Sequence, residues 1–388
     1  MREPLRRAPV LFLNLYGSVG GAERALIELV SVLDRSRFEP HVVLGEAGPL
    51  EAALRERGID VEVEAFPAPP LHRLLLPWVL VREARAALRL RRRARQIGAR
   101  ILQCGDVLGL LLLLPAAWGG ARVVYQVNFL GRGLRLLAFN LLALLSGAEV
   151  VVVSEDQRRR LEAGTWGLRG RTRVIHPGID PAAYTRGDGA ALRAELGLPE
   201  GTPLVGMLAR FDSWKGHVVF LEAAARVLRQ RAGVRFVLVG GALNARQLPH
   251  VARCRDAVLK RRIELRLETA AAVLDHRDDV PGALAALDVL VCPSDHEPFG
   301  MVVLEALAAG RPVVASDSGG PAEIVEDGRS GLLFRTGDPE ALAAAVLRVL
   351  GEPALGRSLA EAGRRRVREG FNRDRYAREV ETVYERLA

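Results

Sequence analysis

The chain has 388 residues, 49% of them hydrophobic and 26% charged, which suits two domains with separate cores better than one domain or a disordered chain. The net charge of +9 only weakly indicates nucleic-acid binding, because aromatic residues are 5% of the chain and no Cys/His spacing typical of a zinc finger occurs. Three widely spaced cysteines, Cys104, Cys254 and Cys292, argue against a disulfide framework and against a metal cluster.

Neither the N-terminus nor the longest apolar run resembles a targeting or membrane-spanning segment. Residues 1–10 are basic, but the apolar run that follows is short and ends at Asn14, unlike the core of a signal peptide. The longest apolar run, residues 107–118, contains Pro115 and is too short to span a bilayer. We therefore expect a cytoplasmic protein, either soluble or peripheral at the inner face of the membrane, with no nucleic-acid partner.

Short β-rich runs alternate with longer amphipathic segments through the first half of the chain. Continuous apolar strands that alternate with helices are typical of a parallel sheet covered on both faces. The predicted strands are 10–16, 41–46, 61–66, 100–105, 122–127, 150–154 and 173–176, and the predicted helices are 21–34, 50–57, 74–96, 134–145 and 155–163.

A second alternating series follows a segment rich in Gly, Pro and Asp, residues 177–203, in which we place the domain boundary. Its predicted strands are 204–209, 235–239, 271–275, 289–292, 312–315 and 331–334, and its predicted helices are 216–231, 245–259, 300–309, 339–350, 354–368 and 373–387. We therefore expect an α/β protein of two doubly wound, Rossmann-like domains, with ligands at the carboxyl ends of strands that face a cleft.

The most informative local pattern is the stretch 293–305, in which a predicted strand ends in a polar turn and Gly300 opens a helix. The first N–H groups of that helix, at Gly300, Met301 and Val302, have no intrahelical acceptors and suit a diphosphate. Glu297 precedes the helix and Glu305 lies inside it, and a carboxylate can accept hydrogen bonds from the two hydroxyls of a sugar diol. The alternative is a surface-loop glutamate and a helix glutamate bonded to a neighbour.

A second pattern, residues 208–217, follows a predicted strand and contains Arg210 and Lys215. Two cations at this point can neutralise a diphosphate leaving group as a substrate bond breaks. The alternative is two solvated surface cations. We favour a functional role because Lys215 and Lys260 are the only lysines of this arginine-rich chain, and arginine does not replace a compact ammonium.

Glycines at other strand ends are weaker indications of ligand contact. Gly20 and Gly21 follow the first predicted strand, where they allow a ligand to approach the backbone or serve tight packing. Gly240 and Gly241 close another strand, and Arg277 follows the next one. They suit the surroundings of a nucleotide, but ordinary turn chemistry explains them equally well.

Together these motifs resemble the retaining glycosyltransferases of family 4, which have the GT-B fold. The likeness covers almost the whole chain. The motifs that carry it, in the order and spacing of the family, lie at 20–23, 153–155, 174–180, 210–217, 297–305, 319–325 and 327–333.

The resemblance implies a role for each matching residue in binding a nucleotide-sugar donor. Arg210 and Lys215 would hold the diphosphate, and Glu297 would contact hydroxyls of the transferred sugar. The backbone from Phe299 through Gly300 and Met301 to Val302 would bind phosphate, and Glu305 would bind the ribose diol. The loop at Gly20 and Gly21 would approach the donor from the other domain, and Gly240 and Arg277 would lie near the base.

The resemblance also implies the reaction and the organisation of the chain. Such enzymes transfer a hexose from a UDP- or GDP-linked sugar to a hydroxyl acceptor with retention of configuration, in bacterial polysaccharide, lipopolysaccharide or glycolipid synthesis, with no cofactor and no required metal. The expected domains are residues 1–187 on the acceptor side and 188–370 on the nucleotide-sugar side, and residues 371–388 would cross back to the first domain. A sugar-nucleotide epimerase of the same fold and a non-catalytic donor-binding homologue are the alternatives.

The sequence departs from the family where many relatives carry histidine near the reacting sugar. Here Asp106 follows one predicted strand, and Gln126 and Asn128 end the next. Gln and Asn form hydrogen bonds but exchange no protons near neutral pH. We assign Asp106 and Asn128 to acceptor-side contacts, with helix capping as an equal alternative.

The arginine-rich segment 74–100 is either a solvated helix face or a basic amphipathic helix that contacts an anionic membrane. In the second case the acceptor is lipid-linked rather than a free glycan.

Overall fold

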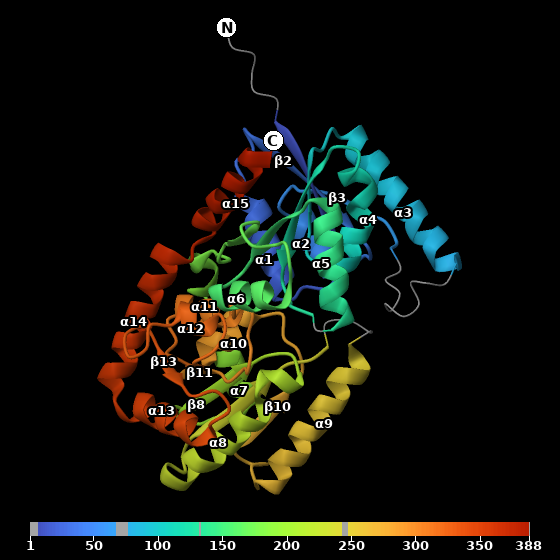
Figure 1. Ribbon diagram of the computed structural model, residues 1–388. Helices are drawn as coiled ribbons and strands as arrows, with labels where there is room; N and C mark the ends of the chain where they lie inside the picture. The colour runs from blue at the N-terminus through green and yellow to red at the C-terminus, as the bar shows by residue number, and fades with distance from the viewer. Residues whose placement is uncertain (1–6, 67–76, 132, 243–246, 388) are drawn as a thin grey trace. The chain divides into compact units, whose positions relative to one another are not determined.

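The computed structural model describes residues 7–66, 77–131, 133–242 and 247–387 (Figure 1). The chain forms two compact units, Met1–His176 with Arg373–Ala388, and Pro177–Asn372. Each unit contains one parallel sheet with helices packed on it, so the predicted α/β class is confirmed.

The sheet of the first unit has seven strands in the order β3-β2-β1-β4-β5-β6-β7, all parallel. Its strands are β1 (Ala8–Asn14), β2 (Phe38–Leu44), β3 (Asp60–Val63), β4 (Ile101–Cys104), β5 (Arg122–Val127), β6 (Glu149–Val152) and β7 (Thr172–Val174). Its helices are α1 (Gly21–Val32), α2 (Pro49–Arg55), α3 (Pro77–Gln96), α4 (Val107–Ala117), α5 (Leu134–Ser146), α6 (Glu155–Gly164) and α15 (Arg373–Leu387).

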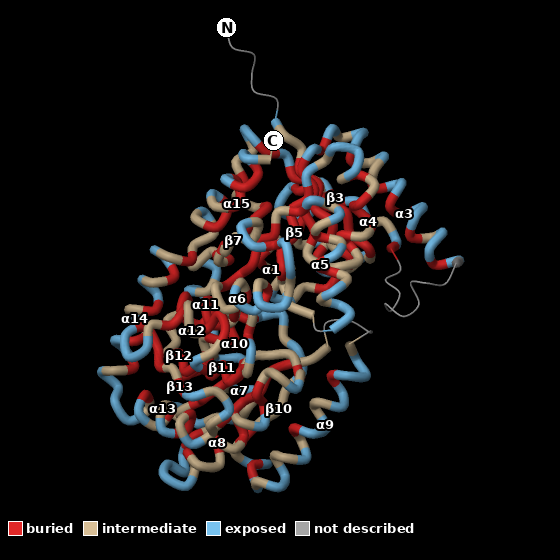
Figure 2. The backbone as a smooth tube through the Cα atoms, in the orientation of Figure 1, coloured by how far each residue is buried: buried red, intermediate tan, exposed pale blue. Residues whose placement is uncertain are grey.

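The core of the first unit follows the two-residue alternation of its strands. Leu11 and Leu13 of β1 pack in one cluster with residues of α3, α4 and α5. The C-terminal helix α15 packs against α1, and its Tyr384 ring lies 5.5 Å from the Phe38 ring. Buried backbone runs through the strands while exposed backbone lines the outer turns of helices such as α3 (Figure 2).

The sheet of the second unit has six strands in the order β10-β9-β8-β11-β12-β13, again all parallel. Its strands are β8 (Leu204–Leu208), β9 (Arg235–Val239), β10 (Ala271–Leu274), β11 (Val289–Cys292), β12 (Val313–Ser316) and β13 (Leu332–Phe334). Its helices are η2 (Pro181–Tyr184), α7 (Ala190–Glu195), η3 (Ser213–Lys215), α8 (His217–Gln230), α9 (Leu248–Glu264), α10 (Val280–Ala286), α11 (Met301–Ala308), α12 (Pro321–Ile324), α13 (Pro339–Gly351) and α14 (Pro353–Gly370).

Each sheet reverses its winding once, between β1 and β4 in the first unit and between β8 and β11 in the second. At such a switch point the loops after the two central strands run to opposite faces of the sheet and leave room for a ligand at the carboxyl edge. The loops that carry the motifs of residues 20–23, 210–217 and 297–305 all leave these central strands.

The second unit begins at Pro177, whereas the sequence predicts that the second domain begins at residue 188. The reason is that the intervening residues pack on the second unit. The short helix η2 contacts α11, and a Cβ atom at Gly187 would lie 2.1 Å from the Pro281 carbonyl oxygen. The second boundary follows Asn372, two residues after the expected one.

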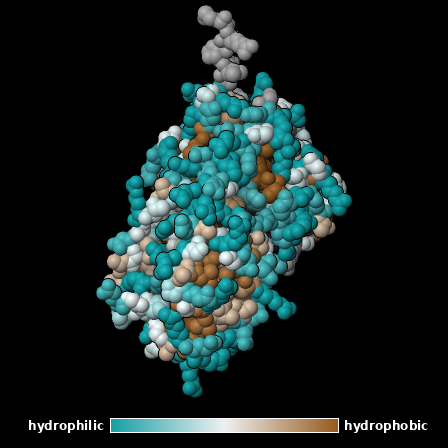
Figure 3. Space-filling view, turned by 90° about the vertical axis from the view of Figure 1, so that its left-hand side faces the viewer, coloured by the Kyte–Doolittle hydropathy of each residue, from teal (hydrophilic) through white to brown (hydrophobic). Residues whose placement is uncertain are grey.

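Two predicted helices begin outside the described residues, at 74 and 245, and the structure describes them from Pro77 and Leu248. No helix in the described ranges has the length and apolar character needed to cross a membrane. The face of the molecule in Figure 3 is mostly hydrophilic, with hydrophobic residues exposed in separate groups.

Candidate functional site

The central strands β8 and β11 bring two distant loops together at the carboxyl edge of the second sheet. The strands pair in parallel, with Val205 opposite Val289. Residues 209–216 continue from β8 and residues 293–300 continue from β11. As a result, the Lys215 ammonium Nζ lies 2.5 Å from Glu297 Oε2, although the two residues are 82 positions apart in the sequence.

The Lys215–Glu297 pair is largely shielded from water, with side chains 16% and 11% exposed. Ser294 donates its hydroxyl to the same Glu297 oxygen at 3.0 Å, and the Lys215 ammonium lies 4.1 Å from the centroid of the Trp214 ring. Both described contacts of the carboxylate use Oε2, so Oε1 is left to accept from another donor. The ammonium is thus a preorganised cation and the carboxylate a partly satisfied acceptor.

Backbone contacts hold the two loops at this separation. The Asp295 N–H donates to the Trp214 carbonyl at 2.8 Å. Gly216 adopts φ 79°, and a Cβ atom there would lie 1.9 Å from the Pro293 carbonyl oxygen, so only glycine fits. The loop geometry therefore depends on residues that carry no charge themselves.

Helix α11 begins directly after Gly300, which has φ 100°. Its first N–H groups point out of the helix beginning and have no acceptor within the helix. Phe299 and Glu305 are buried, and the Tyr184 hydroxyl of η2 donates to Glu305 Oε1 at 3.2 Å. Glu297 and Glu305 therefore flank the helix beginning, one in the preceding loop and one within α11.

Arg210 lies on the same strand-end loop as Lys215 but has a different partner. Its guanidinium Nη2 is 3.0 Å from Asp212 Oδ2, and His250 Nε2 is 3.1 Å from Asp212 Oδ1. Burial raises the pKa of Asp212, but the hydrogen bonds from His250 and Arg210 together bring the pKa below its ordinary value. Asp212 therefore stays ionised and orients the arginine.

The two other donor-side candidates of this unit make contacts that ordinary packing explains. A Cβ atom at Gly240 would lie 2.0 Å from the Ala209 carbonyl oxygen, so the close approach at this glycine is to the chain's own backbone. Arg277 lies 2.5 Å from Glu195 of α7. Their contact with a nucleotide base stays a prediction.

In the first unit, Gly20 and Gly21 connect β1 to α1, and the Gly20 N–H donates to Glu23 Oε2 at 2.9 Å. Asp106 follows the adjacent strand β4 and caps α4, because its side chain accepts from the Gly109 N–H at 2.8 Å. Burial raises the pKa of Asp106 to about 6. Of the two expected roles of Asp106, the structure describes the cap.

Asn128 lies close to Gly105, the residue before Asp106, at the carboxyl edge of the first sheet. A Cβ atom at Gly105 would meet its side-chain Nδ2 at 2.4 Å. Gln126 has different surroundings. It is buried, and its Oε1 accepts from Tyr376 of α15 and from Gln103, each at 3.2 Å. Gln126 is thus a structural anchor of the C-terminal helix.

Three residues of the site in the second unit had no role in the sequence prediction. Ser294 lies inside the motif but carries no charge to mark it. Trp214 directly precedes the lysine and carries no charge. Tyr184 lies in the Gly- and Pro-rich segment interpreted as a linker. Its position, a single tyrosine in a polar segment, is a signal that we could have used.

Two family models match the chain, one over most of each unit. The model described as Glycosyltransferase Family 4 matches residues 19–183, and the model described as Glycosyl transferases group 1 matches residues 202–352. The matched ranges contain all the site residues that the sequence predicts, from Gly20 to Glu305, but not Tyr184.

Curated relatives match about half of the chain. A D-inositol 3-phosphate glycosyltransferase of Nocardia farcinica is 34% identical over 54% of this chain and 46% of its own length. A lipopolysaccharide core biosynthesis glycosyltransferase, LpsE of Rhizobium meliloti, is 34% identical over 47% of this chain and 49% of its own length. The aligned part thus spans about half the length of these relatives.

Among solved structures, HepE of Anabaena in complex with UDP-glucose is similar over nearly its whole length. The TM-score is 0.82 and the sequence identity 26%, with 97% of this chain and 99% of that chain covered. The likeness therefore extends over both sheets and the C-terminal helix.

Proposed function

Because this chain belongs to glycosyltransferase family 4 and has the GT-B fold, we propose that it transfers a hexose from a UDP- or GDP-linked sugar to a hydroxyl acceptor. The observation that carries the proposal is the Lys215–Glu297 pair at the switch point of the second sheet, beside the beginning of α11. A cation, a carboxylate and N–H groups without an acceptor inside the helix meet there, and these three suit a sugar diphosphate.

The cations and the helix act on the leaving group. Lys215 and Arg210 neutralise charge that develops on the diphosphate as the glycosidic bond breaks, and they are most effective where the site excludes water. The N–H groups of Phe299, Gly300 and Met301, together with that of Val302, bind the phosphate oxygens. The limited exposure of Lys215 supports this role.

The carboxylates select the donor at both ends. Glu297 Oε1, which the Lys215 and Ser294 contacts leave available, accepts hydrogen bonds from hydroxyls of the transferred sugar. Glu305 accepts hydrogen bonds from the two hydroxyls of the ribose, and Tyr184 orients the Glu305 carboxylate. Reaction with retention follows if the departing phosphate, held on the attacked face, takes the proton of the acceptor hydroxyl. This route requires neither a protein nucleophile nor a metal ion.

The acceptor is a glycan or a lipid-linked hydroxyl, in keeping with the name of the lipopolysaccharide core relative, and Asp106 and Asn128 contact it. The corresponding biological role is polysaccharide, lipopolysaccharide or glycolipid synthesis.

The test is incubation with a panel of UDP- and GDP-sugars, beginning with UDP-glucose. Nucleotide release that rises with added acceptor, and an α-linked product from an α-linked donor, are expected. An altered sugar without nucleotide release would identify an epimerase instead. Tight binding with neither outcome would identify a donor-binding protein without activity.

A further inference from the structure

Helix α5 exposes a leucine stripe although it also contributes to the core of the first unit. Its inner side, which includes Phe139 and Ala143, is buried in the cluster shared with α3 and α4. Positions three, seven and eleven residues after the first helical residue share a helix face. The leucines at these positions are about half exposed and the first is more so: Leu134 81%, Leu137 53%, Leu141 48% and Leu145 48%.

Exposed tryptophans lie at two edges of this stripe. The Trp118 indole N–H donates to the Leu145 carbonyl at 3.1 Å, and its side chain is 68% exposed. Asn140 of α5 forms two hydrogen bonds with the backbone of Trp166, at 2.8 and 3.2 Å, and Trp166 is also exposed. A contiguous apolar patch bordered by amphipathic rings marks an interaction surface, and such rings favour the boundary between lipid and water.

The charged residues of the segment that carries the stripe are all basic. Residues 107–148 contain no Asp or Glu. Arg135 is exposed on α5, Arg169 is exposed beside Trp166 in the chain, and the Arg171 guanidinium lies 3.7 Å from a Cβ atom placed at Gly147, where α5 ends. An apolar stripe in a segment without acidic residues, with these arginines near it, is complementary to an anionic lipid surface.

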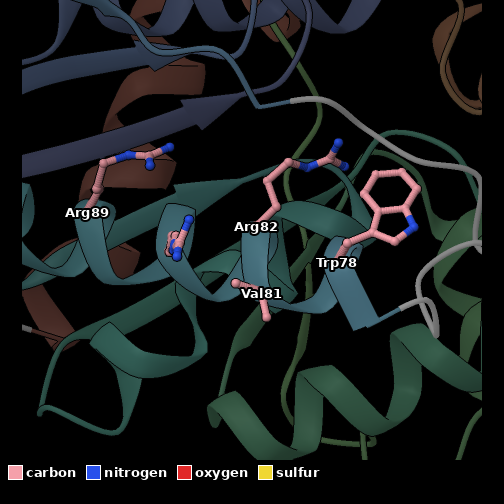
Figure 4. Close-up of a pocket in the computed structure, with 5 residues that line it drawn as sticks. Trp78, Val81, Arg82 and Arg89 are labelled. Carbon is pink, nitrogen blue, oxygen red and sulfur yellow. The ribbon is translucent and has the colours of Figure 1, made fainter.

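The arginine-rich helix α3 is a weaker candidate for this contact. Arg82 and Arg89 project from the side of α3 that carries Trp78 (Figure 4). Arg89 pairs with Glu64, and Arg93 lies 2.7 Å from Glu62. These carboxylates near β3 neutralise much of the charge that the sequence suggested for membrane contact.

We propose that the outer face of α5 (Leu134, Leu137, Leu141 and Leu145, with Trp118 and Trp166 at its edges) docks on the surface of an anionic lipid bilayer. The leucines enter the boundary between headgroups and acyl chains, the indoles lie at headgroup depth, and Arg135 and Arg169 contact lipid phosphates. The stripe is a convex helix face and not a groove. It therefore favours a lipid surface over an acidic or apolar protein partner.

The docking has a consequence for the reaction. Phe129, exposed on the segment that leads to α5, directly follows Asn128, so docking brings the acceptor side of β5 to the lipid surface. The acceptor would then be lipid-linked. This consequence rests on the proposed function, whereas the docking itself does not.

The experiment measures co-flotation of the full chain with phosphatidylcholine vesicles that contain or lack 30% phosphatidylglycerol. The wild type is expected to float only with the anionic vesicles. The Leu137→Gln/Leu141→Gln variant should partition at least about tenfold less, because each leucine contributes apolar area to the insertion. The matched control is Leu248→Gln, which alters a leucine of similar exposure on α9 of the other unit and should float like the wild type.

Circular dichroism of each variant checks folding, and these exposed positions tolerate glutamine in a helix. No flotation of the wild type, or equal flotation of the double variant, overturns the proposal. A wild-type dimer in sedimentation velocity that the double variant loses, without vesicle binding, would assign the stripe to a second copy and also overturns it. Nucleotide release with a water-soluble acceptor tests the transfer reaction separately from docking.

Discussion

Replacing Lys215 with alanine tests the central assignment of the donor site. The Lys215 side chain is 16% exposed, and its ammonium is held by Glu297 and the Trp214 ring, so it is already positioned before a diphosphate binds. Loss of one preorganised charge contact of this kind costs about 100- to 1000-fold in kcat, or roughly 3–4 kcal/mol. Arg210→Ala should cost less, because that side chain is 31% exposed and more of its charge is screened by water.

The assay is initial-rate nucleotide release with saturating donor, at a temperature well below unfolding. Lys260→Ala is the matched control, since it removes the other lysine of the chain from an exposed site on α9 and should leave kcat unchanged. Lys215→Ala also leaves the Glu297 carboxylate without its cation, at a cost to folding on the order of 1–3 kcal/mol. Adding Glu297→Gln removes that uncompensated charge, so stability should recover while turnover stays low.

A kcat for folded Lys215→Ala within threefold of wild type would refute the assignment of Lys215 to the diphosphate. Recovery of turnover in the double variant would also refute it, because the loss would then have come from misfolding of the loop.

Three further substitutions test individual contacts. Burial raises the pKa of Asp106 from 3.8 to about 6, so ionisation of this carboxyl destabilises the fold as the pH rises through that window. Asp106→Asn keeps the cap without the charge. In urea unfolding, the variant should be more stable than wild type by on the order of 1–3 kcal/mol at pH 7.5 and equally stable below pH 4. Tyr184→Phe removes the hydroxyl contact to the α11 carboxylate and should raise the donor KM with kcat unchanged; an unchanged KM contradicts the ribose assignment. A methyl group at Gly320 would lie 2.2 Å from the Phe299 Cα atom, so Gly320→Ala should lower stability by about 1–3 kcal/mol, whereas Gly351→Ala, with open space around it, should not. Equal melting temperatures for the two glycine variants would show that the loop accommodates the methyl group.

The outcomes at individual residues show where sequence reasoning was sufficient. Lys215 and Glu297 were assigned to one site from their positions after predicted strands, and the structure brings them into contact. Gln126 was grouped with Asn128 because both end the same strand. The structure separates them, because Gln126 lies inside β5 and bonds to Tyr376 of α15, whereas Asn128 follows the end of β5 and its side chain lies beside Gly105.

The exposed side of helix α5 could not be predicted from the residues of that helix. Its sequence is apolar on nearly every side, so periodicity does not distinguish a fully buried helix from one with an exposed stripe. Which side is covered depends on α4 and on the length of the sheet, and these are properties of the packed unit.

The stretch 293–305 illustrates the division between sequence and structure. The sequence by itself determined the alternation of strands and helices, the glycine that opens α11, and the charged groups at strand ends, because these depend on local periodicity and residue chemistry. Only the tertiary structure decided which strand ends meet. The pairing of β8 with β11 places Lys215 and Glu297 2.5 Å apart across 82 residues of sequence, since strand order is set by packing of the whole sheet and not by any one segment.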